Sequence, residues 1–377
     1  MKLFKEKYDV IIIGAGLSGI SLALELLNRT NLSVLIIEKK KKFAKDKNWC
    51  FWNKPVNYFT SLSDFSWNEL LININKNKIK KKDSSIQYLC ISSLSYYEKG
   101  LQKIQKFKRA KVTLNMNVKT FYEKNGTVFV ETEKTIYRSN LLFNSIPSQI
   151  NKDKLKQHFL GVEVNCDKNV FNDKQVTLMD FSKKKKTVHF FYVLPFTKQK
   201  ALIETTYFSK KVQTKDKYMI DIKNYLKKNY PKKKFKISYT EHGVLPMYHN
   251  NNNKQTSKNI FNIGITNNWI KMSTGYCLQN AFEKSAQIVD CIIQKKQVKI
   301  ESRSLNKFLD EIFCEFIMRY PDEVKHFFIS FYSKLSLKII VRFLTEKNNL
   351  FELLKVLIIL PKKKLFLSLF YKLKIKI

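Results

Sequence analysis

The chain has 377 residues, of which 44% are hydrophobic, and a formal net charge of +39 at pH 7. This length permits a large core and more than one domain. So basic a chain would suit a nucleic-acid or anionic-membrane partner, but only six of the 70 basic residues are arginines, and arginine makes most base-edge and bidentate phosphate contacts. Lys, Asn, Ile, Phe and Tyr share A- and T-rich codons, so biased coding is the alternative source of the charge. We expect no nucleic-acid partner.

The six cysteines and five histidines show no metal-ligand spacing. The chain has neither a CxxC pair nor an HExxH segment, which argues against a zinc ribbon or a disulfide framework and favours a reducing compartment. We therefore predict no metal site, and we expect His242 and His249 to lie in loops. The N-terminus runs directly into a strand, and the apolar stretches are too short to cross a bilayer. These features predict a cytoplasmic protein.

Residues 8–38 read YDVIIIGAGLSGISLALELLNRTNLSVLIIE. Two short apolar strands, Val10–Ile13 and Val34–Ile37, flank a helical segment, which is the pattern of a βαβ unit with a parallel sheet. Between the first strand and the helix stands GxGxxG, with an acidic residue at the end of the second strand. An ordinary βαβ turn is the alternative interpretation, but the complete set of elements favours a dinucleotide-binding fingerprint.

Each residue of this fingerprint has a physical task. Gly14 permits the tight turn, Gly16 lets the backbone approach a pyrophosphate, Gly19 allows close helix–sheet packing, and Glu38 accepts the ribose hydroxyl groups. The helix N-terminus adds a favourable dipole for phosphate. The position at the start of the chain favours FAD as the cofactor.

The middle of the chain reads as short strands. Residues 126–145 contain strands with a tight turn, and residues 151–250 alternate apolar and polar positions, as an antiparallel sheet does. Within ALIETTYFS, residues 201–209, the carboxyl group of Glu204 interrupts an apolar strand. A buried carboxylate is costly unless it is paired, protonated or used. Alternatively, Glu204 lies on the polar face of a half-exposed strand and pairs with a lysine.

The last third returns to the cofactor domain and then becomes helical. NIFNIGITNN, residues 259–268, is a short strand ending in Gly264, and Ser273, Thr274 and Gly275 precede a helix expected over residues 276–293. From residue 296 the pattern is helical, and Pro361 should separate two short helices. These are either core-capping helices or an interfacial surface.

The expected fold is α/β (α+β), with a Rossmann-like FAD-binding domain, an inserted antiparallel-sheet substrate domain and a helical C-terminal region. The expected boundaries are 1–150 for the main part of the FAD domain, with a substrate-side excursion near 60–85, then 151–250 for the sheet, 255–295 for the return segment and 296–377 for the helical cap.

At this point the sequence resembles the lycopene cyclases of carotenoid synthesis, specifically the bacterial β-cyclase type. The resemblance rests on an ordered set of blocks along nearly the whole chain: KDKNWCFW (45–52), FNSIP (143–147), TLMDF (177–181), FFYVLPFTKQKALIETTYFS (190–209), HGVLPM (242–247) and NIGITNNWIKMSTGY (262–276). The chain departs from the family pattern at Ile146, where arginine is usual, at Met272, where proline is usual, at Asn267 and Asn268, which replace small residues, and at Thr205, where some relatives have a second acid.

The resemblance implies a redox-neutral cyclisation of the linear ends of lycopene, or a related acyclic carotenoid, to β-ionone-type rings. It implies Glu204 as the proton donor, reduced FAD as the group that stabilises the carbocation, and NAD(P)H as its reductant. Asp180 either helps to hold the proton or lies in a surface turn before the lysines of residues 183–186. Trp49 and Trp52 form a substrate wall or pack in the core, and the face of Tyr192 is a further candidate for cation–π support.

The FAD site is expected to include Gly264, Thr274 and Gly275 besides the N-terminal fingerprint. A water-insoluble carotenoid substrate implies peripheral contact with the inner face of the plasma membrane. An FAD-dependent monooxygenase or isoprenoid reductase of similar fold is the alternative function, and a basic membrane- or RNA-binding module is a third.

Overall fold

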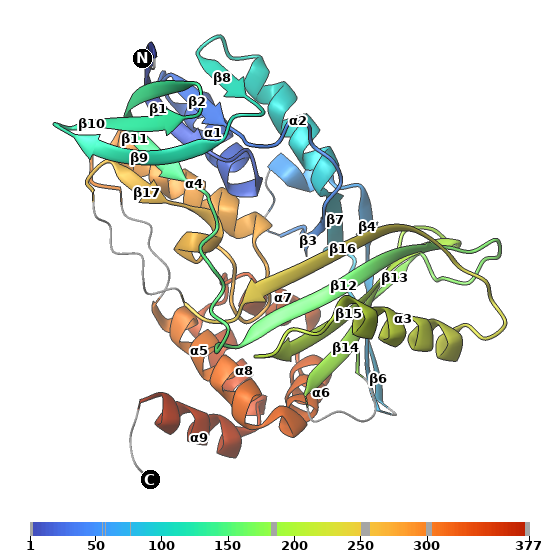
Figure 1. Cartoon of the computed structure of the whole chain (residues 1–377). Coiled ribbons are helices and arrows are strands. Elements are labelled where there is room, and N and C mark those ends of the chain that lie inside the picture. Colours follow the sequence, from blue (N-terminus) through green and yellow to red (C-terminus); the bar gives the residue numbers. More distant parts are fainter. Residues whose placement is uncertain are drawn as a thin grey trace.

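The computed structural model describes residues 3–54, 56, 58–75, 77–181, 187–249, 257–298 and 304–373. It confirms the α/β fold class, with a mixed sheet bearing helices at one end of the molecule and a large, mostly antiparallel sheet with helices at the other (Figure 1). The lysines of residues 183–186 lie outside the described residues.

The first sheet is built around the two apolar strands of the βαβ unit. In spatial order it contains β8 (Ala110–Thr113), β2 (Val34–Ile37), β1 (Leu3–Ile13), β11 (Thr135–Asn144), β10 (Thr127–Thr132) and β9 (Val118–Lys124), with β17 (Ile260–Asn262) paired to β11. Strands β8, β2, β1, β11 and β17 run parallel to one another, whereas β10 is antiparallel to β11 and to β9. Residues 10–13 and 34–37 are buried, as expected for central parallel strands.

Three helices cover one face of this sheet: α1 (Leu17–Arg29), α2 (Ser93–Gln105) and α4 (Leu278–Ile293). Helix α4 comes from far along the chain, because the return segment brings it beside α1. It starts at Leu278, two residues later than the sequence pattern predicts. The hairpin of β9 and β10 contributes to a second core on the opposite face.

The second sheet holds the middle of the chain and one excursion from the N-terminal part. Its spatial order is β16 (Lys236–Pro246), β12 (Lys156–Asn165), β15 (Lys200–Ser209), β14 (Val188–Pro195), β13 (Gln175–Phe181), β5 (Glu69–Ile74) and β6 (Asn77–Lys82). All neighbours are antiparallel except β13 and β5, which are parallel. The expectation of a loop at His242 was wrong, since this residue lies within β16.

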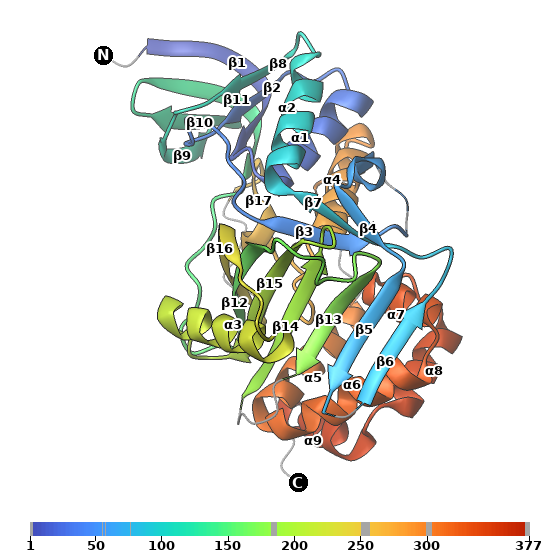
Figure 2. The same cartoon turned by 90° about the vertical axis from the view of Figure 1, so that its right-hand side faces the viewer.

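Helices cover both faces of the second sheet. Helix α3 (Lys215–Asn229) packs on one face, and the C-terminal helices lie against the other (Figure 2). The C-terminal set comprises α5 (Ser304–Arg319), η3 (Pro321–Glu323), α6 (Val324–Lys334), α7 (Leu337–Leu344), α8 (Leu350–Ile359) and α9 (Lys362–Lys372), and Pro361 separates the last two as predicted. Within the described residues, none of the helices combines the length and hydrophobicity that a membrane crossing requires.

A small three-stranded sheet lies between the two large sheets (Figure 2). It consists of β3 (Asn48–Trp52), β7 (Tyr88–Ser92) and β4 (Phe65–Trp67), and the short helix η1 (Tyr58–Leu62) precedes β4. Residues of β3 therefore belong to both halves of the molecule, since Trp49 packs in the core of the first sheet and Trp52 in that of the second.

A buried ion triad ties the return segment to the C-terminal helices. The ammonium group of Lys271, with 8% of the residue exposed, lies 3.0 Å from Asp310 Oδ2 and 2.7 Å from Glu346 Oε1. The backbone of Lys271 also accepts hydrogen bonds from the N–H groups of Thr274 and Gly275. The conformation of residues 271–276 thus depends on two carboxylates of the C-terminal region.

Candidate active site

The glycine-rich turn between β1 and α1 has a hollow that suits a ligand. A Cβ atom on Gly14 would lie 2.2 Å from Ser145 Oγ, and one on Gly19 would lie 1.9 Å from the Gly14 carbonyl oxygen. A Cβ atom on Gly16 would meet no atom within 4 Å. Gly14 also has a φ of +94°, a conformation that favours glycine. Gly14 and Gly19 therefore serve packing, and Gly16 opens the turn.

The start of α1 is prepared for an anion. No side chain caps the helix at Gly16, and its first turn contains no acidic residue, so the N–H groups and dipole of this end suit phosphate. The buried Glu38 accepts hydrogen bonds from the N–H groups of Ala15, at 2.7 Å, and Lys40, at 2.9 Å. Its carboxylate thus lies directly against the turn, at the end of β2.

The return segment runs from this turn to a cavity. Gly264 begins η2 (Gly264–Asn267) with a φ of +72°, and a Cβ there would lie 2.9 Å from Ser18 Oγ of α1. Thr274 and Gly275, ten and eleven residues further on, line the cavity, and Gly275 has a φ of +76°. The structure therefore brings Gly264 to the glycine-rich turn and places Thr274 and Gly275 at the other end of the segment.

A cavity of about 560 Å³ lies between the second sheet and the C-terminal helices. Aromatic and aliphatic side chains dominate its wall, including Trp49, Tyr192 and Tyr276, and its polar side chains include Glu204 and Glu241. Trp52 is fully buried in the core and is absent from the wall. A long hydrophobic molecule would find here an apolar surface with two carboxyl groups at one place.

Glu204 projects into this cavity from the middle of β15. The residue is 7% exposed, and its Oε1 atom accepts a 2.5 Å hydrogen bond from the hydroxyl group of Thr206. Burial, together with the negative charge of Glu241, raises the pKa of Glu204 to about 8 and outweighs the opposing effect of Thr206. Glu204 is therefore protonated at neutral pH, as a general acid must be.

Glu241 is a second cavity carboxyl that the sequence interpretation missed. It lies on β16, is 4% exposed, and accepts hydrogen bonds at Oε2 from Asn48 Nδ2, at 2.8 Å, and from the Tyr239 hydroxyl group, at 3.2 Å. Burial raises its pKa to about 7, although both hydrogen bonds and Lys45 act to lower it. No local pattern marked it, because the alternating set Tyr239, Glu241, Gly243 and Leu245 is no more apolar than the residues between its members.

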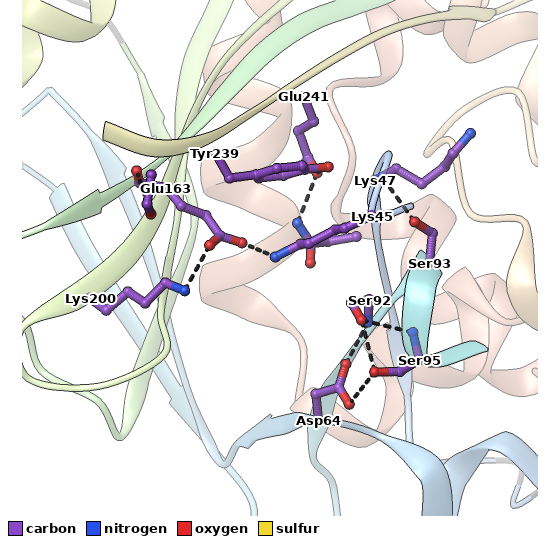
Figure 3. Close-up of polar contacts among 12 residues, drawn as sticks. Lys45, Lys47, Asp64, Ser92, Ser93, Ser95, Glu163, Lys200, Tyr239 and Glu241 are labelled. Atoms are coloured by element: carbon purple, nitrogen blue, oxygen red, sulfur yellow. Dashed lines mark hydrogen bonds and ion pairs between the residues drawn. The ribbon is translucent and has the colours of Figure 1, made fainter. Parts of the chain in front are cut away.

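Hydrogen bonds at the start of α2 hold the segment that carries Asn48 (Figure 3). Ser93 Oγ accepts from the N–H groups of Asp46, at 2.9 Å, and Lys47, at 3.2 Å, and the Ser93 N–H donates to the Lys47 carbonyl oxygen. On the sheet side, Lys45 pairs with the buried Glu163 of β12. The segment that carries Asn48, the donor to Glu241, is thus held by α2 on one side and by β12 on the other.

The other sequence candidates near Glu204 lie on the opposite face of the sheet. Asp180 of β13 accepts a 2.8 Å hydrogen bond from the hydroxyl group of Tyr225 on α3 and does not line the cavity. Thr205 is fully buried and bonded to His189 Nε2 at 2.7 Å, so a second acid at this position would point away from the cavity. The structure brings Glu204 together with Glu241, and it does not bring Asp180 to either.

Comparison with known proteins identifies relatives of both sequence and fold. The family model described as "Lycopene cyclase protein" matches residues 9–369. A geranylgeranyl bacteriochlorophyll reductase-like structure from Thermoplasma acidophilum has a TM-score of 0.74 at 12% identity, covering 99% of both chains. A flavoprotein/dehydrogenase from Cytophaga hutchinsonii has a TM-score of 0.64 at 14% identity, covering 97% of this chain and 100% of the other.

A flavin-dependent brominase, Bmp2, has a TM-score of 0.61 at 13% identity, with 90% of this chain and 94% of the other covered. At these identities the likeness shows the fold alone. None of the curated proteins searched matches the sequence.

The described residues contain no group of three His, Cys, Asp or Glu side chains placed to hold a metal ion.

Proposed function

Because the chain belongs to the lycopene cyclase family, we propose that it closes β-ionone-type rings on the linear ends of lycopene or a related acyclic carotenoid. The reaction begins when an acid protonates the terminal double bond. A neighbouring double bond then attacks the tertiary cation, and loss of a proton leaves the ring alkene. No atom is gained or lost, so the reaction is an isomerisation.

The observation that supports this proposal is the buried carboxyl group of Glu204 in an apolar cavity. An alkene is a weak base, so its protonation needs a positioned acid and a site from which water is excluded. Glu204 meets both demands, because burial holds it in the protonated form and the surrounding wall is mainly aromatic and aliphatic. Trp49 and Tyr192 offer ring faces that each stabilise a nearby cation by about 1–2 kcal/mol.

The proposal includes FAD, kept reduced by NAD(P)H. Gly16 offers the open approach for the pyrophosphate, and Glu38 offers a carboxylate for the ribose. When bound there, reduced FAD would supply negative charge to stabilise the carbocation by electrostatics. In Gly16→Val the side chain would fill the hollow, so we expect purified wild-type protein to carry FAD and this variant to lose it. Full flavin content in the variant would contradict the assignment.

The C-terminal helices supply a surface for peripheral membrane contact, which is also part of the proposal. Leu350, Phe351 and Ile358 of α8 are 63–76% exposed, and Phe366 of α9 is exposed while also lining the cavity. Exposed lysines on both helices suit anionic lipid. We expect Phe351→Ser to weaken sedimentation with anionic vesicles, whereas Tyr122→Ser, an exposed aromatic residue of β9, should not. Equal binding by both variants would refute this surface.

Mass spectrometry of the product made in D₂O tests the reaction itself. FAD-loaded, reduced full-length protein should convert lycopene to a product with one deuterium per ring, because one solvent-derived deuteron is added and one proton is lost. In H₂O the product should have the mass of the substrate, with no net NAD(P)H consumed. A product with an added oxygen would indicate a monooxygenase, and one with two added hydrogens an isoprenoid reductase.

A further inference from the structure

Glu204 and Glu241 flank a glycine on the cavity face of the second sheet. Gly161 of β12 is the register partner of Glu204 on one side and of Glu241 on the other. Residues directly opposite each other in a sheet share a face. A Cβ at position 161 would lie 3.1 Å from Glu241 Cγ and 3.5 Å from its Oε1. The Glu241 side chain therefore extends over Gly161, toward the strand that carries Glu204.

The two carboxyl groups have unequal hydrogen-bond donors. Among the described residues, Glu204 accepts from Thr206, whereas Glu241 accepts from both Asn48 and Tyr239 and lies near the positive charge of Lys45. Two carboxylates in one dry site do not both ionise at neutral pH. The one proton left to the two groups consequently resides on Glu204, and Glu241 is the ionised partner.

We propose, building on the function above, that Glu241 is the base that completes ring closure. The O–H bond of Glu204 breaks as its proton forms a C–H bond on the terminal alkene, and a second π pair forms the ring C–C bond. The C–H bond beside the resulting cation then breaks. Its electron pair becomes the ring double bond, and its proton binds the Glu241 carboxylate. Loss of that proton from Glu241 to solvent and uptake of a solvent proton by Glu204 restore the starting state, so no co-reactant is consumed.

This division of roles predicts a bell-shaped dependence of activity on pH. Glu204 must be protonated, so activity falls as pH rises through about 8. Glu241 must be ionised, so activity falls as pH drops through about 7. These limits belong to the pair rather than to either residue alone. The charged or titratable groups around the pair are Lys45 and Lys47 before β3, Cys90 of β7, Glu163 of β12, Tyr192 of β14, and Tyr239 of β16.

Glu241→Gln, studied in the FAD-loaded, reduced full-length protein, tests this role. We expect kcat to fall about 10²-fold or more, KM to stay within about twofold, and the acid-side fall in activity to disappear. Glu241→Asp should restore part of kcat. The matched control is Asp221→Asn, which alters a buried carboxyl of α3, on the opposite side of the second sheet, that does not line the cavity. It should keep the wild-type pH profile.

Infrared difference spectroscopy provides a readout that does not depend on turnover. The carboxylic-acid band of Glu204 should be present at pH 7 in the wild type and should titrate at lower pH in Glu241→Gln, because a neighbouring negative charge is gone. Gly161→Ala keeps both carboxyls but places a Cβ against Glu241, and it should lower kcat about tenfold with unchanged flavin content.

The results separate this proposal from the function on which it rests. An active wild type combined with a Glu241→Gln variant that keeps more than about a tenth of kcat and the acid-side fall would overturn the role of Glu241 alone. A wild-type protein that forms no ring from any acyclic carotenoid would overturn the function, whatever the infrared titration shows.

Discussion

Both faces of the second sheet bury polar side chains, but the surroundings of these side chains differ between the two faces. On the face under α3, His158 contacts the hydroxyl groups of Tyr218 and Ser209, and Tyr207 donates to Asp221. Each of these groups is packed and paired. On the opposite face, Glu204 and Glu241 border a cavity, and burial together with the negative charge of Glu241 raises the cost of ionising Glu204. The hydrogen-bonded polar groups under α3 stabilise the fold, whereas carboxyl groups with a raised pKa beside a cavity indicate a functional site.

Among the variants that test this comparison, Glu204→Gln should have the largest effect on activity. The amide keeps the size of the side chain but cannot donate the proton that starts ring closure, so cyclisation should fall about 10²–10⁴-fold. Pigment analysis of cells that accumulate lycopene would measure the loss, and flavin content and thermal unfolding should be unchanged. Activity above about a tenth of wild type would mean that the proton comes from another group.

Acid should weaken the α3 face. Burial, followed by the positive charges of Lys156 and His242, lowers the pKa of His158 to about 4. In the unfolded chain this pKa is about 6.5. As pH falls from 6.5 to 4, the unfolded state therefore binds a proton that the folded state excludes, and about 1–3 kcal/mol of stability should be lost. In His158→Gln, urea unfolding at several pH values should show a smaller acid-dependent loss; an identical slope would contradict this contribution.

Asp180→Asn should have the smallest effect. The asparagine can still accept the hydrogen bond from Tyr225, and its side chain faces α3 rather than the cavity. We expect kcat within about twofold of wild type and a change in the free energy of unfolding of about 1 kcal/mol or less. A loss of activity comparable to that in Glu204→Gln would give Asp180 a catalytic role and erase the distinction between the two faces.

Local patterns predicted the cofactor half of the fold well. The apolar strands at residues 10–13 and 34–37 and the glycine spacing follow from short-range rules. The pairing of Glu204 with Glu241 does not, because it depends on β12 lying between two strands distant in sequence. Glu241 stands between Thr240 and His242, without the apolar neighbours that drew attention to Glu204. Likewise, no local pattern shows that Asp180 faces α3, since a strand bulge shifts the register between Thr177 and Asp180. Thr205 is different, because alternation along a strand places it on the face opposite Glu204.

The buried triad of Lys271, Asp310 and Glu346 also bears on how the chain is made. A buried ammonium group without its partners is costly, and ribosomes produce Lys271 well before either carboxylate. The turn at residues 271–276, which lines the cavity, therefore acquires its native environment only when the C-terminal helices have been synthesised. Because proteins begin to fold during synthesis from the N-terminus, the first sheet can form early, while the cavity is completed only after Glu346 has been made.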